Sequence, residues 1–197
     1  MVHRTIYLVR HGITRSNIEK VYAGWGEEEL TEEGVTKVDE LGKELQGWGI
    51  SYLFTSPVKR AIQTAQILNK YIHGKLVIDP DLKEMKMGTW EGLSEDEVAT
   101  KYPSEYRIWG EKPAELQLDG RERLEEVQQR GMRAIKRILE LHQEAVSLAV
   151  THVAIIRCLF LYFSHLPLNS YKAVDVPNHS IHRVIFNKGR IAIERIG

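Results

Sequence analysis

Short β-type runs alternate with longer helical runs along most of this chain. The β-type runs cover residues 5–9 (TIYLV), 51–55 (SYLFT), 76–78 (LVI) and 145–150 (AVSLAV). The last run is apolar almost throughout, which is typical of a strand buried on both faces of a parallel sheet. Strands that alternate with helices predict a mainly parallel sheet that helices cover on both faces.

The helical runs are recognised by apolar residues three or four positions apart. Thr31 suits the N-cap of the first helix, and Ser56 with Pro57 suits the cap and first position of the second. Ser94 opens a capping-box spacing that predicts a third helix. The positions expected to be buried on the first, second and fourth helices are Val35, Val38, Leu41, Leu45 and Trp48; Ala61, Ile62, Ala65, Leu68 and Ile72; and Leu124, Val127, Gly131, Ile135, Ile138, Leu139 and His142.

The last part of the chain completes the sheet. Residues 153–164 are expected to form a buried helix after the 145–150 strand. Residues 181–186 and 191–196, joined across 187–190, have the pattern of a β-hairpin, which adds an antiparallel edge. The predicted fold class is α/β: a three-layer α/β/α sandwich with a mainly parallel, mixed sheet.

Composition narrows the class of protein further. A length of 197 residues suits a single domain, 1–197, and 27 basic residues balance 27 acidic ones. This balance argues against a nucleic-acid partner, since such proteins usually carry a basic excess. Cys158 is the single cysteine, so no internal disulfide can form, and we expect it to be a small buried hydrophobe. The apolar runs are too short for a signal peptide or a membrane span, which predicts a cytoplasmic protein with no membrane partner.

Charged and histidine side chains follow three of the predicted strands. Arg10 and His11 end the first, Arg60 lies one turn into the helix after the second, and His152 ends the 145–150 strand. Ligands of open α/β sheets bind beyond the carboxyl ends of the strands. We therefore expect two arginines and two histidines to meet there as an anion site.

This combination of side chains suits phosphate chemistry. Guanidinium groups match phosphate oxygens and keep their charge. A histidine between two cations should have its protonation disfavoured, so that one ring nitrogen is free to attack phosphorus. The leaving alcohol then needs a proton donor, and Glu84 in the 82–92 segment is the best-placed carboxyl group by elimination.

Each residue has an ordinary alternative when it is taken alone. Arg10 and His11 could be a solvated strand end, Arg60 a surface residue of a helix, and His152 a capping or core histidine. Glu84 could be a loop acid. The hypothesis depends on their joint placement. A metal site at the two histidines is disfavoured because the two arginines would repel a cation.

Taken together, the motifs resemble those of the histidine phosphatase superfamily, which includes the cofactor-dependent phosphoglycerate mutases. The resemblance covers nearly the whole chain in order. It is carried by residues 8–17 (LVRHGITRSN), 30–34 (LTEEG), 55–65 (TSPVKRAIQTA), 82–92 (LKEMKMGTWEG), Thr151-His152 with Arg157, and 177–181 (PNHSI).

The resemblance implies a role for each matching residue. His11 would be the phosphorylated nucleophile, Glu84 the general acid and base, and Arg10, Arg60 and His152 would hold the phosphoryl oxygens. The expected substrate-binding residues are Asn17, Gly12, Thr14, Gly24 and Val153. Asn17 would add a neutral hydrogen bond, and Gly12 would let the backbone pass close to the histidine ring. No metal and no cofactor is implied.

Two positions depart from the pattern of the family. Val153 stands where a glycine commonly follows the second histidine, and it could narrow the pocket or, as we favour, point into the helix packing. Arg121 and Arg123 stand in a segment that is usually Gly-Gly-Glu-Ser. They could bind a substrate carboxylate or second phosphate, but acidic neighbours favour solvent-exposed positions.

Three functions remain open. Mutases of this superfamily carry a longer lid between the general acid and the long helix, whereas here the lid-like insertion around residues 85–120 is small, which favours hydrolysis. The expected partner is a small phosphomonoester, and the chain looks similar to the α-ribazole, phosphoserine and broad-specificity phosphatases. Residues 22–25 and 102–120 are expected to reach its organic part. A non-catalytic phosphate-binding module is the third alternative, and exposed edge strands would suit a homodimer.

Overall fold

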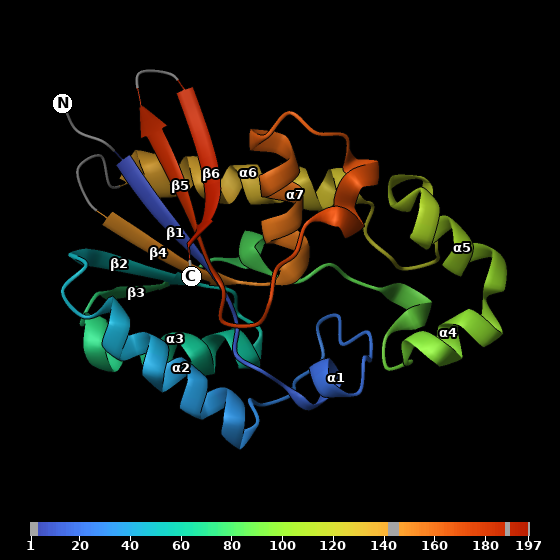
Figure 1. Ribbon diagram of the computed structural model, residues 1–197, viewed down its shortest axis with the longest axis horizontal. Coiled ribbons are helices and arrows are strands. Elements are labelled where there is room, and N and C mark those ends of the chain that lie inside the picture. The colour runs from blue at the N-terminus through green and yellow to red at the C-terminus, as the bar shows by residue number, and fades with distance from the viewer. Residues whose placement is uncertain (1–3, 142–145, 188–189, 197) are drawn as a thin grey trace.

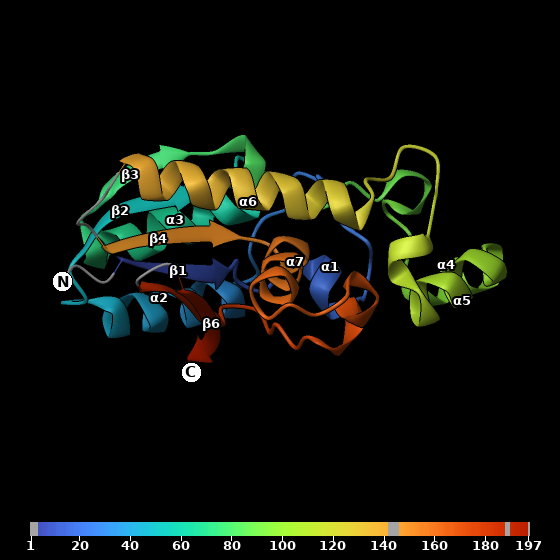
Figure 2. The same ribbon diagram turned by 90° about the horizontal axis from the view of Figure 1, so that it is seen from above.

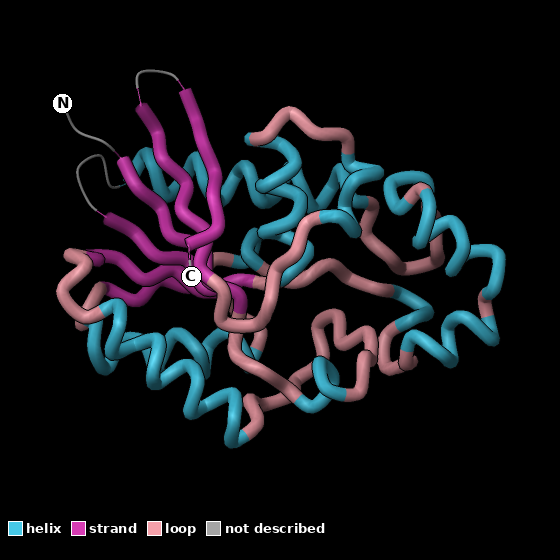
Figure 3. Tube along the Cα trace, in the orientation of Figure 1, coloured by secondary structure: helices cyan, strands magenta, loops and turns pink. Residues whose placement is uncertain are grey.

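The computed structural model describes residues 4–141, 146–187 and 190–196. Its strands form one six-stranded sheet in the order β3-β2-β4-β1-β5-β6. The strands are β1 (Arg4–Arg10), β2 (Ile50–Thr55), β3 (Lys75–Ile78), β4 (Val146–Thr151), β5 (Ile181–Asn187) and β6 (Arg190–Ile196). Figure 3 shows them gathered in one sheet with helices on either side.

The pairing of the strands confirms the mainly parallel, mixed sheet. β4 lies between β1 and β2 and is parallel to both, and β3 is parallel to β2. β5 is antiparallel to β1 and β6 is antiparallel to β5, as a hairpin requires. The central strand β4 is buried at Leu148, Ala149 and Val150, which agrees with its apolar sequence.

Helices cover both faces of this sheet, so the three-layer α/β/α architecture is confirmed. α2 (Glu32–Leu45) and α3 (Lys59–Ile72) pack on one face, against strand residues such as Val9 and Leu53. α6 (Leu124–Leu141) and α7 (Val153–Phe163) pack on the other, against Leu8 and Ala149. Figure 1 and Figure 2 show the two helix layers with the sheet between them.

Helix α2 begins where its sequence predicts. The hydroxyl of Thr31 accepts a hydrogen bond from the backbone N–H of Gly34 at 3.0 Å, which caps the helix. Val38, Leu41 and Leu45 are buried as expected. The prediction was wrong for Val35 and Trp48, which are partly exposed, because the helix ends at Leu45 and Val35 lies outside its buried stripe.

Helix α3 begins later than predicted. Its N-cap is Val58 and its first residue is Lys59, whereas the sequence suggested Ser56 as cap and Pro57 as first residue. The hydroxyl of Ser56 instead accepts a hydrogen bond from the Val58 N–H at 3.2 Å and lies 2.8 Å from a ring nitrogen of His152. Ser56 therefore orders the turn that leads from β2 into the helix.

The segment between the sheet's edge and α6 carries two further helices. α4 (Glu95–Lys101) begins at the capping box of Ser94 and Glu97, as predicted, and α5 (Pro103–Glu111) follows it. Both lie beyond the end of the sheet, to the right in Figure 1 and Figure 2. The remaining helical segments are short: α1 (Arg15–Ile18) and the 3₁₀ turns Pro80–Leu82, Gly88–Trp90, Pro113–Glu115 and Leu168–Ala173.

The buried face of α6 agrees with its sequence pattern at Leu124, Val127, Gly131, Ile135 and Ile138. The predicted positions His142 and Ala145, and residues 188–189 of the hairpin connection, lie outside the described residues. In the part of the chain that the structure describes, no helix is both long enough and apolar enough to cross a membrane.

Candidate active site

Three neighbouring strands end beside one another and deliver the predicted side chains to one place. The backbone N–H of His11, just after β1, donates to Thr151 O at the end of β4 at 3.1 Å. The N–H of Ser56, just after β2, donates to Val150 O of the same strand at 3.0 Å. His11 and His152 consequently face each other, with ring centroids 5.0 Å apart.

The ring of His11 is buried and held in one orientation. Its Nδ1 lies 2.7 Å from Gly12 O, and because a carbonyl can only accept, Nδ1 carries the proton. Nε2 then keeps its lone pair and accepts a hydrogen bond from Nε of Arg60 at 3.2 Å. Burial, with Arg60 and Arg10 nearby, lowers the pKa of His11 well below its usual 6.5. The imidazole is therefore neutral near pH 7, and Nε2 is its unprotonated nitrogen.

Arg60 is almost fully buried, with 1% of its surface exposed. Its guanidinium donates to Gly24 O at 2.8 Å and to Gly26 O at 3.1 Å, besides its bond to His11. Glu28 lies 3.9 Å away, an acid near the site that the sequence did not reveal. These contacts fix the cation against the nucleophile. Arg60 thus belongs to the site and is no surface residue of α3.

Arg10 supplies the second guanidinium group. One of its terminal nitrogens donates to Val176 O at 2.6 Å, while its buried Nε has no hydrogen-bond partner among the described residues. Burial lowers the pKa of Arg10 to about 10, so it still carries its charge near neutral pH. A buried, charged N–H group without a partner is costly unless an anion binds there.

His152 lies behind His11, with none of its surface exposed. Its Nε2 contacts Ser56 Oγ at 2.8 Å, and its Nδ1 has no partner among the residues described. Burial and the charge of Arg60 lower its pKa well below 6.5. His152 is therefore a neutral second imidazole beside the nucleophile.

The carboxyl group of Glu84 is held at one oxygen. Oε1 accepts the backbone N–H of Met85 at 2.7 Å and that of Ala154, in the first turn of α7, at 3.3 Å. Glu84 lines the same cavity as His11 and Arg60, so a carboxyl group and the nucleophile share one space. This is the arrangement that proton transfer to a leaving group requires.

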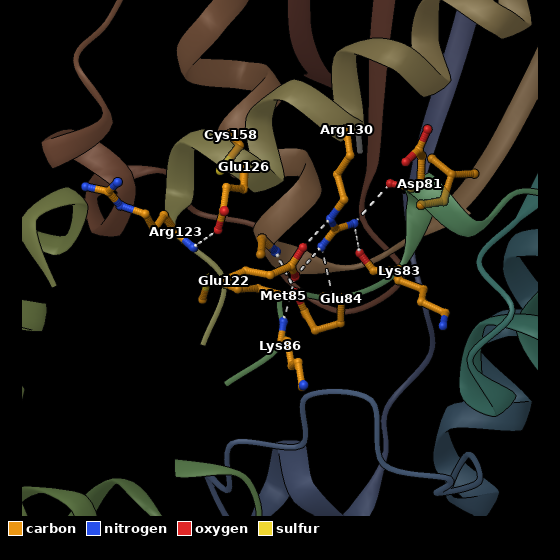
Figure 4. Close-up of polar contacts among 12 residues, drawn as sticks. Asp81, Lys83, Glu84, Met85, Lys86, Glu122, Arg123, Glu126, Arg130 and Cys158 are labelled. Carbon is orange, nitrogen blue, oxygen red and sulfur yellow. Dashed lines mark hydrogen bonds and ion pairs between the residues drawn. The ribbon is translucent and has the colours of Figure 1, made fainter. Parts of the chain in front are cut away.

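The backbone that carries Glu84 is clamped from α6. Arg130, 7% exposed, donates to the carbonyls of Asp81 at 3.0 Å, Lys83 at 2.5 Å and Glu84 at 2.9 Å. It also pairs with Glu122 at 2.9 Å, and Glu122 accepts the N–H of Lys86 at 2.8 Å. Figure 4 shows Arg130 reaching across to all three carbonyls.

Two further donors act on the same backbone. Nε1 of Trp25 donates to Glu84 O at 2.7 Å, and the hydroxyl of Thr151 donates to Leu82 O at 2.7 Å. Each carbonyl from residue 81 to residue 84 therefore accepts a side-chain hydrogen bond. Nothing in the local sequence pattern indicated Arg130, whose spacing marks it only as one more residue of a long amphipathic helix.

The cavity has a volume of about 460 Å³, which is the size of a small-metabolite pocket. Of the predicted site residues, it is lined by Arg10, His11, Asn17, Gly24, Arg60, Glu84 and Val153. Among the residues 22–25 and 102–120 expected to reach the substrate, Tyr22, Ala23, Gly24 and Trp109 line it. We favoured packing within the helix for Val153. The side chain lines the cavity and also packs against the hydrophobic core, so both alternatives hold.

Two predicted substrate-binding residues lie elsewhere. Thr14 is fully buried and its hydroxyl donates to Glu28 at 2.8 Å, so it orders the loop after β1. A Cβ on Gly12 would lie 2.7 Å from the side chain of Val38, so the missing side chain makes room for helix α2. Gly12 contributes through its carbonyl, which holds Nδ1 of His11.

Asn17 and Asn178 form an amide pair at the cavity wall. Nδ2 of Asn178 donates to Asn17 Oδ1 at 2.8 Å and to His11 O at 3.1 Å. Because Oδ1 of Asn17 accepts this bond and one from Thr14 N, its NH₂ group is the part that can donate to an anion. Asn178 was quoted in a motif but given no role, since its bonds to the His11 loop depend on tertiary packing.

Arg121 does not occupy the solvent-exposed position that we favoured. It is 8% exposed, donates to Leu116 O at 3.0 Å and stacks its guanidinium 4.8 Å from the ring centre of Trp109. It does not line the cavity, whereas Arg123 is exposed as expected. The acidic neighbours in the sequence did not reveal that Arg121 packs against Trp109 of α5.

The site thus combines a buried neutral histidine, two guanidinium groups and a carboxyl group that lines the same cavity, an arrangement suited to binding an anion. In the described ranges, no group of three or more His, Cys, Asp or Glu side chains is arranged to hold a metal ion. The sequence profile of the histidine phosphatase superfamily (branch 1) matches residues 6–197. The chain belongs to this superfamily, and its fold confirms the resemblance found in the motifs.

Individual relatives carry different activities in their names. The probable phosphoglycerate mutase GpmB of Proteus mirabilis is 30% identical over 183 residues, which are 91% of this chain and 83% of the relative. Phosphoserine phosphatase 1 of Hydrogenobacter thermophilus is 24% identical over 191 residues, 97% and 90% of the two chains. The solved structure of Bacillus stearothermophilus YhfR matches with a TM-score of 0.92 and 29% identity, and covers 98% of this chain and 96% of that one.

Proposed function

We propose that this protein hydrolyses small phosphomonoesters through a phosphohistidine on His11. The observation that carries the proposal is the state of the His11 ring: Nδ1 is tied to Gly12 O, and Nε2 is unprotonated and lies beside Arg60. A neutral imidazole with a fixed free nitrogen, facing a cavity with two cations, is an activated nucleophile for phosphorus.

The first step transfers the phosphoryl group to the histidine. Nε2 forms the bond to phosphorus as the ester oxygen leaves with its electron pair and takes a proton from Glu84. Arg10, Arg60 and the NH₂ group of Asn17 bind the phosphoryl oxygens, where negative charge is concentrated in the transition state. The product alcohol then leaves the cavity.

The second step returns the enzyme to its starting state. The carboxylate of Glu84 takes a proton from a water molecule as the water oxygen attacks phosphorus and the P–Nε2 bond breaks. Inorganic phosphate is released, and Glu84 is again protonated for the next ester. No step requires a metal ion or an added cofactor, and we expect the reaction to take place in the cytoplasm.

Phosphoryl transfer between hydroxyl groups is the second candidate, and the name of the Proteus mirabilis relative favours it. The name of the Hydrogenobacter thermophilus relative, and the small size of the insertion that carries α4 and α5, favour hydrolysis. The two candidates share the first step. They differ in whether water or a second substrate hydroxyl accepts the group from the histidine.

The experiment is a turnover assay with a panel of phosphorylated metabolites and p-nitrophenyl phosphate, with and without a chelator. We expect release of inorganic phosphate that the chelator does not alter. An isomerised ester without phosphate release would favour the mutase. Chelator-sensitive turnover would exclude the metal-free reaction, and phosphate binding without any turnover would leave a binding module.

A further inference from the structure

The cavity continues past the phosphoryl end to a second, aromatic end. Trp109 of α5 and Tyr171, in the 3₁₀ turn before β5, are both buried and their ring centres lie 5.2 Å apart. Both line the cavity, as does Tyr22. Segments distant in the sequence thus build one aromatic wall of the cavity. A bare phosphate ion would leave this end of a 460 Å³ cavity empty.

Two cations lie against this aromatic wall, and a third lines the same cavity. The ammonium group of Lys172 lies 5.2 Å from the ring centre of Trp109. The guanidinium of Arg157 lies 5.0 Å from that of Tyr171 and donates to Val174 O at 2.8 Å. Lys20 lines the cavity with them. Within the described part of the chain, none of these cations has a carboxylate within 4.0 Å, so no salt bridge neutralises them.

The charges of the cavity do not balance once a phosphoryl group is bound. Arg10 and Arg60 serve that group, and Glu84 serves the leaving oxygen. The other acid that lines the cavity is Glu95, set against the three distal cations. Burial lowers the pKa of Lys172, and the charge of Arg157 acts in the same direction, whereas Glu95 opposes them only in part. An anion bound at this end would balance the excess positive charge and would pair with the buried ammonium group of Lys172.

We propose that the distal end, formed by Lys20, Arg157 and Lys172 with the Trp109–Tyr171 wall, binds a second anionic group of the substrate. The substrate class is then a phosphomonoester whose short organic part carries a carboxylate or a second phosphate. This rests on the proposed function for the identity of the first group. The proposed second-anion site lies at these three residues and not at Arg121 and Arg123, for which the sequence offered anion binding only as the less favoured alternative.

Binding of non-hydrolysable phosphonates tests the distal end without any turnover. Isothermal titration compares butylphosphonate, 4-phosphonobutanoate and butane-1,4-bisphosphonate, which present no second anion, a carboxylate and a second phosphonate. We expect at least one of the two ligands that carry a second anionic group to bind about tenfold more tightly than butylphosphonate. The ligand that binds more tightly then identifies which anion the distal end prefers. In Lys172→Met this preference should largely disappear.

Lys112→Met is the matched control, because Lys112 is a lid lysine that pairs with Glu115 and does not line the cavity. It should keep the wild-type preference. Equal affinities for all three ligands, or a preference that survives in both Lys172→Met and Arg157→Met, would overturn the distal site. Failure of the corresponding esters to turn over, with the preference for phosphonates intact, would instead contradict only the proposed hydrolysis.

Discussion

At the scale of single residues, the site separates two proton functions. His11 is kept neutral by burial and two guanidinium groups, whereas Glu84 has one oxygen held by backbone N–H groups and faces the cavity. The proposed nucleophile and proton donor therefore lie on different segments, the turn after β1 and the loop after β3. This separation allows each to be tested without disturbing the other.

Glu84→Gln removes the transferable proton but keeps an oxygen that can accept from Met85 N and Ala154 N. We expect kcat/KM for alkyl phosphates to fall about 10²–10⁴-fold, and much less for p-nitrophenyl phosphate, whose leaving group needs no proton. A burst of p-nitrophenol followed by slow turnover should appear, because the base for the second step is also missing. An equal loss for both kinds of ester would remove Glu84 from the acid role.

The site residues at the strand ends could be predicted from the sequence, because residues that directly follow parallel strands lie together at one edge of the sheet. His11 and His152 directly follow β1 and β4, and Arg60 is one turn into α3. The sequence could not show that Thr14 and Gly12 do not line the cavity, because they lie in the same motif as His11 and a motif does not say which of its residues face a cavity. Asn178 and Arg10's bond to Val176 depend on packing of the distant 176–180 segment.

At the scale of elements, the segment that carries Glu84 is irregular but not loosely held. Its carbonyls are bound by Arg130, Thr151 and Trp25, which come from α6, β4 and the loop after α1. A fixed backbone leaves the carboxyl group with few orientations, which favours proton transfer along one direction. Arg130 acts through Glu84 and is a positioning residue.

Arg130→Lys keeps the charge but replaces five N–H donors by the three of an ammonium group, which cannot serve three carbonyls and the Glu122 carboxylate at once. We expect kcat for alkyl phosphates to fall about tenfold with a smaller change in KM, and p-nitrophenyl phosphate to be less affected. Steady-state kinetics with both esters, at a temperature where the variant is folded, measures this.

Arg133→Lys is the matched control for that comparison. Arg133 is on the same helix and bonds to the side chain of Asp81 at 3.0 Å, but it does not reach the carbonyls of residues 83 and 84. Arg133→Lys should leave kcat unchanged for both alkyl phosphates and p-nitrophenyl phosphate. Should Arg130→Lys keep the wild-type ratio of the two rates, the clamp would have a structural role alone.

Elements with regular patterns were predictable, and irregular ones were not. The caps at Thr31 and Ser94 are local hydrogen bonds, so their sequence signals were sufficient. The start of α3 was misplaced because Ser56 bonds to Val58 N and to His152, a partner 96 positions away. The 102–120 segment was expected to reach the substrate, but no local pattern showed that α5 would line the cavity through Trp109 alone.

At the scale of the whole molecule, the site imposes a cost on stability in acid. His11 and His152 have folded-state pKa values below the 6.5 of an unfolded histidine, so below pH 6.5 the unfolded chain binds protons that the folded chain does not. The contribution of these two neutral histidines to the free energy of unfolding is complete above pH 6.5 and is lost as the pH falls below it. Each histidine adds a slope of about 1.4 kcal/mol per pH unit once the pH is well below 6.5.

Urea unfolding between pH 7.5 and 5.0, in buffers without phosphate, measures this slope. We expect the free energy of unfolding to decrease toward pH 5.0 and His152→Gln to reduce the decrease by about half of the two-histidine contribution. Phosphate should be avoided because a bound anion would stabilise the folded state and mask the effect. A free energy that does not change over this range would contradict buried, neutral histidines.

The overall architecture was the most predictable property. The alternation of strand and helix patterns along the sequence is enough to predict a sheet covered by helices, with no knowledge of long-range contacts. The assembly of the cavity was only partly predictable: Tyr22 and Trp109 lie in segments that were expected to reach the substrate, whereas Lys172 and Tyr171 come from a segment that no motif marked. The homodimer stays a prediction. β3 and β6 are the edge strands of the sheet, and sedimentation equilibrium would decide the oligomeric state.

The central claim is that His11 carries the phosphoryl group, and trapping of the intermediate tests it most directly. Rapid mixing with a ³²P-labelled ester, a quench in alkali, which preserves phosphohistidine, and peptide mapping should place one phosphoryl group on Nε2 of His11, with no labelling in His11→Ala. A label on His152 or another residue, or turnover with no trapped intermediate and inversion at phosphorus, would contradict the account.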